Sequence, residues 1–177
     1  MNGSGAQVPA SFAPWFRAAP APGARVRLVC LPHAGAGASL FHGWHRSMPA
    51  DVQVCPVHLA GRETRHGEPL ADNIELIVNE LAPALTAFLD RPYALFGHSM
   101  GALIAFELAR ELRRRGAALP LRLFASAARA PHLQSKLRLL HRLADRSFID
   151  QVARIDRAVA GSAEERALAE IALAAPR

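Results

Sequence analysis

Lysine is almost absent from this sequence of 177 residues. Lys136 is the one lysine, so the net charge of +6 at pH 7 is carried almost entirely by arginine. The arginines are scattered through alanine-rich sequence without interleaved aromatic residues, and no nucleic-acid-binding motif is present. The composition therefore argues against nucleic acid as a partner.

Cysteine is also rare, occurring only as Cys30 and Cys55. Each lies within an apolar run that suits a buried strand. Two such thiols are more consistent with small core side chains than with a disulfide or a catalytic role. We expect neither a metal nor a cofactor.

Long hydrophobic runs are missing too. No apolar stretch approaches the ~20 residues of a membrane span, and residues 1–24 lack the basic and apolar regions of a signal peptide. We therefore expect a cytoplasmic protein without membrane contact. The hydrophobic content of 51% excludes a disordered chain and suits one compact domain.

Apolar runs typical of buried strands alternate with helical patterns along the chain. We expect strands over 26–31, 52–59, 93–96 and 121–127, and helices near 39–48, over 73–89 and directly after Ser99. Such alternation predicts parallel strands joined by helical crossovers, with helices on both faces of the sheet. The expected fold class is α/β.

Two helix ends carry signals of their own. Asp72 and Glu75 are spaced as a capping box ahead of the second helix, and Pro83 is expected to kink that helix. The third helix ends in three arginines and Gly116, which places cations at the negative end of the helix dipole before a glycine stop. We interpret this arginine cluster as a solvated helix end rather than a docking patch.

We divide the chain into three parts. Residues 1–24 are rich in proline, alanine and glycine and are expected to form a flexible leader, with Trp15 and Phe16 as its points of attachment. Residues 25–132 form the core. Residues 133–177 show helical periodicity without a strand-like run, and we expect a helical, lid-like segment there.

The segment YALFGHSMGALIAFELAR carries the main chemical motif. An apolar run meets the sequence GHSMG and then a helical pattern, which predicts a strand, a sharp turn and a helix. Gly97 and Gly101 are required at such a turn because a side chain at either position would collide with a neighbouring strand or helix. We interpret Ser99 as a nucleophile and expect His98 to pack within the turn.

A second motif, CLPHAGAGAS, follows the first expected strand. Small residues let the main chain approach a substrate, and a tetrahedral oxyanion needs two donors. We assign these donors to the backbone N–H groups of Ala34 and Met100, with His33 and Gly35 supporting the loop. The motif lacks both the dinucleotide-binding spacing and the Lys-Ser/Thr of a nucleotide loop, which disfavours phosphate binding.

Four segments together resemble the type II thioesterases of nonribosomal peptide and polyketide assembly lines, the pathways of many antibiotics. These segments are RLVCLPHAGAGASLFHGW, VQVCPVHLAGRETRHGEP, YALFGHSMGALIAFELAR and LRLFASAARAPHL. The resemblance runs from about Trp15 into the lid-like segment, with Ala36 where family members often have glycine. It implies an α/β-hydrolase-like, mostly parallel sheet.

The same resemblance implies an activity. Members of this family hydrolyse acyl or aminoacyl thioesters on the phosphopantetheine arm of acyl or peptidyl carrier proteins. By motif match, Ser99 would be the nucleophile, and the amides of Ala34 and Met100 would form the oxyanion hole. Carrier proteins are commonly acidic, so the arginines of this chain would favour their docking.

The base and acid that a serine nucleophile needs do not occur in the expected order. On this fold an Asp or Glu and then a His follow the serine, on loops after later strands. Beyond Ser99 the histidines are His132 and His141. All the aspartates beyond Ser99 come after them: Asp145, Asp150 and Asp156. Glu107 and Glu111 come earlier, but they lie on the helix that begins at the serine.

Compared with the family, we therefore expect the final strands to be missing and this chain to be inactive or impaired on its own. The strand over 121–127 would then have a bare apolar edge that favours association.

Two other functions stay open. A malonyl-type acyltransferase also uses a Gly-His-Ser-x-Gly turn, but it would need a Gly-Gln-Gly-Ser-Gln loop where this chain has PHAGAG. A non-catalytic remnant that binds carrier proteins is favoured by the absent acid and base. In GRETR, we expect Arg62 and Arg65 to be loop surface rather than substrate contacts.

Overall fold

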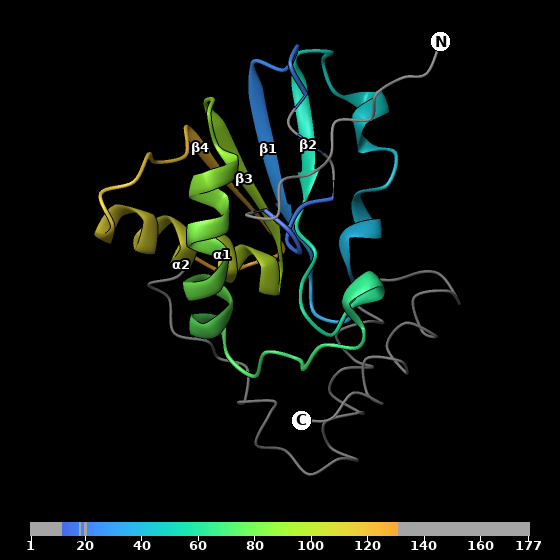
Figure 1. The fold of residues 1–177 in the computed structure, drawn as a ribbon, viewed down its shortest axis with the longest axis vertical. Helices are drawn as coiled ribbons and strands as arrows, with labels where there is room; N and C mark the ends of the chain where they lie inside the picture. Colours follow the sequence, from blue (N-terminus) through green and yellow to red (C-terminus); the bar gives the residue numbers. More distant parts are fainter. Residues whose placement is uncertain (1–11, 18, 20, 131–177) are drawn as a thin grey trace. The chain divides into compact units, whose positions relative to one another are not determined.

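The computed structural model describes residues 12–17, 19 and 21–130. They form a parallel sheet of four strands in the order β2-β1-β3-β4 (Figure 1). The elements in chain order are β1 (Val26–Leu31), η1 (Ala38–Phe41), η2 (Trp44–Ser47), β2 (Val52–Pro56), η3 (Glu63–Arg65), α1 (Ile74–Phe88), β3 (Tyr93–His98), α2 (Met100–Arg114) and β4 (Arg122–Ser126). The expected α/β class is confirmed. The expected lid-like segment lies outside the described residues.

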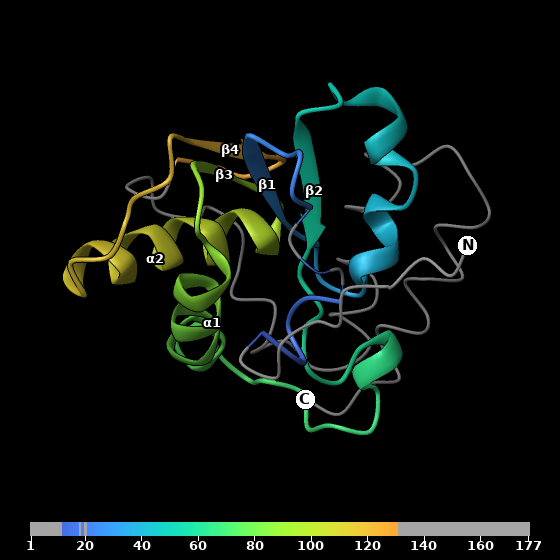
Figure 2. The same ribbon diagram turned by 45° about the horizontal axis from the view of Figure 1, so that its top comes forward.

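Strand β1 occupies the middle of the sheet and is covered on both faces. Val29 and Leu31 belong to a core cluster with residues of α1 and α2. Leu28 and Cys30 point to the other face and pack in a cluster with Phe41 of η1. Figure 2 shows α1 and α2 on one side of the sheet and the segment 38–47, in cyan, on the other. Burial on both faces explains why β1 reads as a continuous apolar run.

The boundaries of three expected elements need correction. The prediction of one helix near 39–48 is wrong, because two short 3₁₀ helices occupy this segment. Gly43 separates them and has a φ of +83°, outside the helical region. Strand β2 ends at Pro56 instead of residue 59. Strand β3 is longer than expected and continues to His98.

Helix α1 is capped by Asn73, so the expected capping box at Asp72 is wrong. The Asn73 side chain accepts a hydrogen bond of 2.8 Å from the Leu76 N–H, whereas Asp72 accepts one from the Asn73 amide. The helix continues through Pro83, which has no N–H for the carbonyl of Asn79. Arg115, the C-cap residue that follows α2, donates to that carbonyl at 3.5 Å. The kink itself stays a prediction.

Helix α2 ends at a glycine, as expected. Gly116 has a φ of +66°, its N–H donates to the Arg113 carbonyl, and the Ala117 N–H donates to the Leu112 carbonyl at 2.9 Å. This pair of bonds is a Schellman motif, in which the residue after the helix must adopt the left-handed conformation. The chain is thereby turned from α2 toward β4.

The described part of the leader is attached to the domain. Trp15 and Phe16 are buried in the core, as expected, and the Phe16 ring stacks on Phe88 with the centroids 4.3 Å apart. Further along, the Gln53 side chain accepts from the Ala21 N–H. The division of the chain into leader, core and lid-like segment stays a prediction, because much of the first and last parts lies outside the described residues.

Both cysteines are free and buried, as expected. Burial raises the pKa of both thiols, that of Cys55 to about 12. Neither thiol is therefore a thiolate at neutral pH, which agrees with a purely packing role.

Strand β4 pairs with β3 alone among the described strands. Its residues are poorly covered: Phe124 is 51% exposed, and the neighbouring Leu121 is 56% exposed. The bare apolar edge expected for this strand stays a prediction, because residues 131–177 lie outside the described part of the chain. No helix in the described part of the chain is long and apolar enough to cross a membrane.

Candidate active site

Ser99 lies at the turn between β3 and α2 and is exposed. Its φ of 52° and ψ of −111° lie outside the regions that L-residues favour, so the backbone is strained at this position. The Ser99 N–H donates to the Ser126 carbonyl at 2.9 Å, and its carbonyl accepts from the Ala102 N–H at 3.0 Å. The hydroxyl does not cap α2, and it makes no hydrogen bond within the described residues.

Gly97 and Gly101 make the turn possible. A Cβ atom at Gly97 would lie 2.2 Å from the carbonyl oxygen of Gly101, and one at Gly101 would lie 2.1 Å from that of Leu31. Such distances are far below van der Waals contact, and the atoms involved belong to the backbone. The two glycines therefore let β3, α2 and the end of β1 approach one another, for the steric reason expected from the sequence.

The loop after β1 runs beside this turn, since Leu31 at its start pairs with Gly97. Ala34 is exposed, and Gly35 has a φ of +86°. The His33 ring nitrogen Nδ1 lies 2.7 Å from the Ala34 carbonyl oxygen, so it donates in the tautomer that carries its proton there. His33, Gly35 and Ala36 are half-buried, whereas Gly37 is buried.

His33 and His98 are brought together at this edge of the sheet. Their ring centroids lie 5.5 Å apart, with an angle of 71° between the planes. His98 is half-buried within the turn, and its Nδ1 lies 2.9 Å from the Ser126 hydroxyl. Burial, and then the nearby His33, lower the pKa of His98, which favours a neutral ring.

The glutamates of α2 pair with arginines of the same helix and with its C-cap residue Arg115. Glu107 pairs with Arg110 at 2.9 Å. Glu111 accepts from Arg114 and Arg115, and these hydrogen bonds lower the pKa of Glu111 to about 2. Neither carboxylate has a described contact with a histidine.

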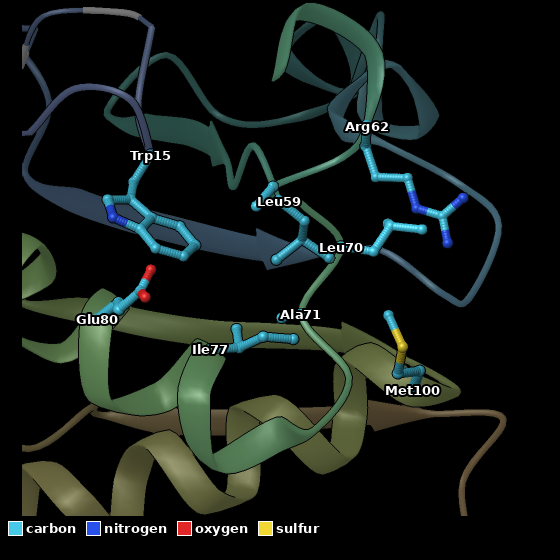
Figure 3. A pocket seen from close by; sticks show the side chains of 9 residues that line it. Trp15, Leu59, Arg62, Leu70, Ala71, Ile77, Glu80 and Met100 are labelled. Atoms are coloured by element: carbon cyan, nitrogen blue, oxygen red, sulfur yellow. The ribbon is translucent and has the colours of Figure 1, made fainter. Parts of the chain in front are cut away.

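A cavity of about 60 Å³ lies beside the turn and is shown in Figure 3. Met100, the residue after Ser99, directs its side chain toward this cavity, and Arg62 and Glu80 contribute charged groups to the lining. The other lining residues are largely apolar: Trp15, Leu59, Ala60, Leu70, Ala71 and Ile77.

Arg65 is buried, so its expected place on the loop surface is wrong. It is 5% exposed, donates to the His58 carbonyl at 2.7 Å, and places its guanidinium 4.5 Å from the Trp15 ring centroid. Two further hydrogen bonds, of 2.8 and 2.5 Å, join it to Glu68. The spacing of Arg65 and Glu68 was a signal for this pairing. These contacts of Arg65, which we call the arginine clamp, connect the loop after β2 to Trp15 of the leader.

Glu63 was not identified from the sequence as a site residue. Its carboxylate accepts from the Ser39 N–H at 3.0 Å, which connects the loop after β2 to η1. No local pattern reveals this contact, because it joins residues far apart in the chain. Within the described residues, no group of three or more His, Cys, Asp or Glu side chains could hold a metal ion.

Comparison with known proteins gives a consistent set of matches. The model of the thioesterase domain family matches residues 26–175. The chain is 43% identical over 126 residues to the linear gramicidin dehydrogenase LgrE of Brevibacillus parabrevis, covering 71% of this chain and 48% of LgrE. It is 40% identical over 129 residues to the gramicidin S biosynthesis protein GrsT of Aneurinibacillus migulanus, covering 73% of this chain and 50% of GrsT.

One solved structure is similar to this chain in both fold and sequence. The type II thioesterase BorB, from the borrelidin biosynthetic cluster, superposes with a TM-score of 0.73 at 35% identity, covering 90% of this chain and 66% of BorB. The chain spans about half the length of the curated relatives it matches.

Proposed function

Because this chain belongs to the thioesterase family, we propose that it supplies the nucleophile and oxyanion hole of a serine thioesterase. The substrates are acyl or aminoacyl thioesters on the phosphopantetheine arm of carrier proteins, in nonribosomal peptide or polyketide synthesis. The resemblance and the α/β-hydrolase-like fold expected from the sequence are confirmed.

The conformation of Ser99 is the observation that carries this proposal. A strained backbone at an exposed serine, between a strand and a helix, is the arrangement that presents a nucleophilic hydroxyl at the edge of a sheet. The hydroxyl attacks the thioester carbon, the C–S bond breaks, and the thiol leaves with a proton. Water then hydrolyses the acyl-Ser99 ester and restores the serine.

The oxyanion formed during attack is stabilised by two backbone donors. One donor is the N–H of Met100, the first residue of the 15-residue helix α2. The positive end of the helix dipole at this N-terminus favours negative charge. The Ala34 N–H is the second donor, from the loop after β1. Gly97, Gly101, His98, His33 and Gly35 support these two segments. Among the described residues, none is assigned as the base that activates Ser99 or as the carboxylate partner of that base.

The name of LgrE includes a dehydrogenase activity, which we do not propose for this chain. A dinucleotide pyrophosphate needs a glycine-rich turn that opens a helix. Here the loop after β1 leads into η1, which has only four residues. The dinucleotide-binding spacing of glycines is absent from the sequence as well.

Covalent labelling tests the proposal directly. The protein encoded by the complete gene is treated with a fluorophosphonate and analysed by mass spectrometry, with Ser99→Ala as the control. An adduct on Ser99 supports the thioesterase, whereas a folded protein without one supports the non-catalytic carrier-binding alternative. Transfer of malonyl groups to a carrier thiol, in preference to water, would favour the acyltransferase instead.

A further inference from the structure

We propose that Glu63 is a positioning residue, which holds the loop carrying the Ala34 amide in the geometry needed for attack by Ser99. The inference rests on the proposed function, because the Ala34 amide matters only if an oxyanion forms beside Ser99. Glu63 lies 24 residues after Ser39 in the sequence, and its carboxylate crosses from the loop after β2 to η1.

Glu63 makes two hydrogen bonds to one residue of η1. The Ser39 N–H donates to Oε1 at 3.0 Å, and the Ser39 hydroxyl donates to the same oxygen. Gly37 packs directly against the carboxylate, since a Cβ at this glycine would lie 2.3 Å from the Glu63 Cδ. The absence of a side chain at Gly37 leaves the space that the carboxylate occupies.

These contacts fix one end of the loop, and α2 fixes the other. A Cβ at Gly101 would lie 2.1 Å from the Leu31 carbonyl oxygen and 2.7 Å from that of Pro32, so the start of the loop packs tightly against the first turn of α2. The end of the loop is held at Ser39 by Glu63. The direction of the Ala34 N–H between these two points depends on both anchors.

Within the loop, few bonds constrain Ala34. The Ala36 N–H donates to the His33 carbonyl at 3.2 Å, and the His33 ring contacts the Ala34 carbonyl. Both bonds are between neighbours in the loop and would move with it. Among the described residues, the two anchors and the contact between the His33 and His98 rings relate Ala34 to the turn at Ser99. Glu63 is the anchor that comes from the loop after β2.

Glu63 is itself held firmly. Its φ of +43° is unusual for a residue other than glycine. Its carbonyl accepts from the His66 N–H at 3.1 Å. Arg65, two residues further on, is buried, donates to the His58 carbonyl and places its guanidinium over the Trp15 ring. The carboxylate therefore projects toward η1 from a fixed base.

The contact between Glu63 and Ser39 affects the stability of the transition state more than that of the bound substrate. A donor to the oxyanion contributes most when negative charge has developed, so displacing the loop lowers kcat more than it raises KM. A small displacement of a catalytic group can reduce the rate by about 100-fold. Loss of the Glu63 contact leaves the donor in place but unanchored, and we expect kcat to fall by about tenfold or more.

The test compares four glutamate variants in the protein encoded by the complete gene. Glu63→Ala removes the anchor, whereas Glu63→Gln keeps an acceptor oxygen at the same reach. Glu63→Asp keeps the charge but is one methylene too short, and aspartate tolerates a positive φ better than glutamate, so this variant should fold normally. Glu75→Ala removes an exposed glutamate of α1 and serves as the control.

Hydrolysis of an acyl-pantetheine thioester and the rate of fluorophosphonate labelling at Ser99 are measured for each variant. We expect Glu63→Ala and Glu63→Asp to lose about tenfold or more in kcat with KM within about twofold. Glu63→Gln should recover most of the loss, and Glu75→Ala should match the wild type. Unchanged kcat in folded Glu63→Asp, or equal losses in Glu63→Gln and Glu63→Ala, would overturn the inference.

Hydrogen–deuterium exchange separates this inference from the proposed function. Exchange in the segment 33–41 should accelerate in Glu63→Ala and Glu63→Asp but not in Glu75→Ala, whether or not the protein hydrolyses thioesters. A wild-type protein without hydrolysis and without labelling at Ser99 would refute the proposed function. Unchanged exchange in the two Glu63 variants would refute the positioning role alone.

Discussion

Gly101 packs so closely against the carbonyl of Leu31 that a Cβ atom would lie 2.1 Å from the carbonyl oxygen. This contact joins the first turn of α2 to the end of β1, and thereby joins the two segments that carry the proposed oxyanion donors. Neither backbone can move away without disturbing the sheet, since Leu31 is also paired with Gly97.

Replacing Gly101 with alanine is therefore expected to damage both the fold and the site. The added methyl group would force the backbones apart and lower the free energy of unfolding by about 3 kcal/mol. Urea denaturation measures this loss. Gly23→Ala is the control, because no atom lies within 4 Å of a Cβ at Gly23. Equal stability of the two variants would show that the close approach is relaxed in solution.

The strain at Ser99 gives a second prediction. Its φ of 52° is costly for serine but not for glycine. Ser99→Gly should therefore raise the free energy of unfolding by about 1 kcal/mol while abolishing fluorophosphonate labelling.

Ser99→Ala is the matched control for this measurement. Alanine removes the hydroxyl but keeps the Cβ atom and hence the strain, so its stability should stay close to that of the wild type. If Ser99→Gly were no more stable than Ser99→Ala, the serine backbone would not be strained.

The arginine clamp of the loop after β2 predicts a third effect. Arg65→Met would leave the His58 carbonyl without its hydrogen bond and remove the guanidinium from the Trp15 ring. We expect a loss of about 2 kcal/mol in the free energy of unfolding. Arg65→Lys should recover only part of it, because an ammonium group cannot bind Glu68 through two parallel bonds.

Thermal denaturation followed by circular dichroism measures the stability of these Arg65 variants. Arg46→Met, at an exposed position of η2, is the control and should melt like the wild type. Wild-type stability in Arg65→Met would mean that the leader and this loop do not depend on the clamp.

The sequence was most informative where structure depends on near neighbours. The span of β1, the glycines of the turn at Ser99 and the stop at Gly116 follow from local sterics and periodicity, and all three are observed. The cap of α1 was misassigned by one residue, from Asp72 to Asn73. Both residues are good caps, and the choice between them depends on where the incoming chain turns.

Contacts between distant residues could not be predicted in the same way. Arg27 is the one charged residue of the otherwise apolar strand β1, and its side chain is fully buried. It is accommodated because the Phe88 carbonyl accepts from Nη1 at 2.6 Å and Asp90 pairs with the guanidinium. Glu63 and Ser39 likewise meet only once the sheet has formed. Such partners depend on tertiary packing, which a single sequence does not display.

The proposed carrier partner predicts a dependence on salt. An acidic carrier protein attracted by the arginines should bind more weakly as the salt concentration rises from about 0.05 to 0.5 M, because the ions screen exposed charges. Isothermal titration calorimetry with a phosphopantetheinylated carrier measures the Kd. An affinity independent of salt would exclude this electrostatic contribution.

Arg113→Gln tests whether the arginine cluster at the end of α2 takes part in that binding. Our interpretation of the cluster as a solvated helix end predicts an unchanged Kd and an unchanged salt dependence. A weaker and less salt-dependent complex would instead place the carrier on this end of α2.

Glu111 makes the stability of the domain depend on pH. Hydrogen bonds from Arg114 and Arg115 lower its pKa from the ordinary 4.5 to about 2. Because the pKa is lower in the folded state, the native protein favours the ionised carboxylate. The resulting stabilisation is complete above about pH 5 and is lost as the pH falls toward 2.

Glu111→Gln removes this contribution. The variant should be less stable than the wild type near pH 6, and the difference between them should shrink steadily as the pH is lowered from about 5 toward 2. Urea denaturation at a series of pH values measures it. Because the shift comes from two arginines, replacing both Arg114 and Arg115 with glutamine should abolish the pH-dependent difference. A difference that stayed constant from pH 6 to pH 3 would show that these arginines do not hold the Glu111 carboxylate in solution.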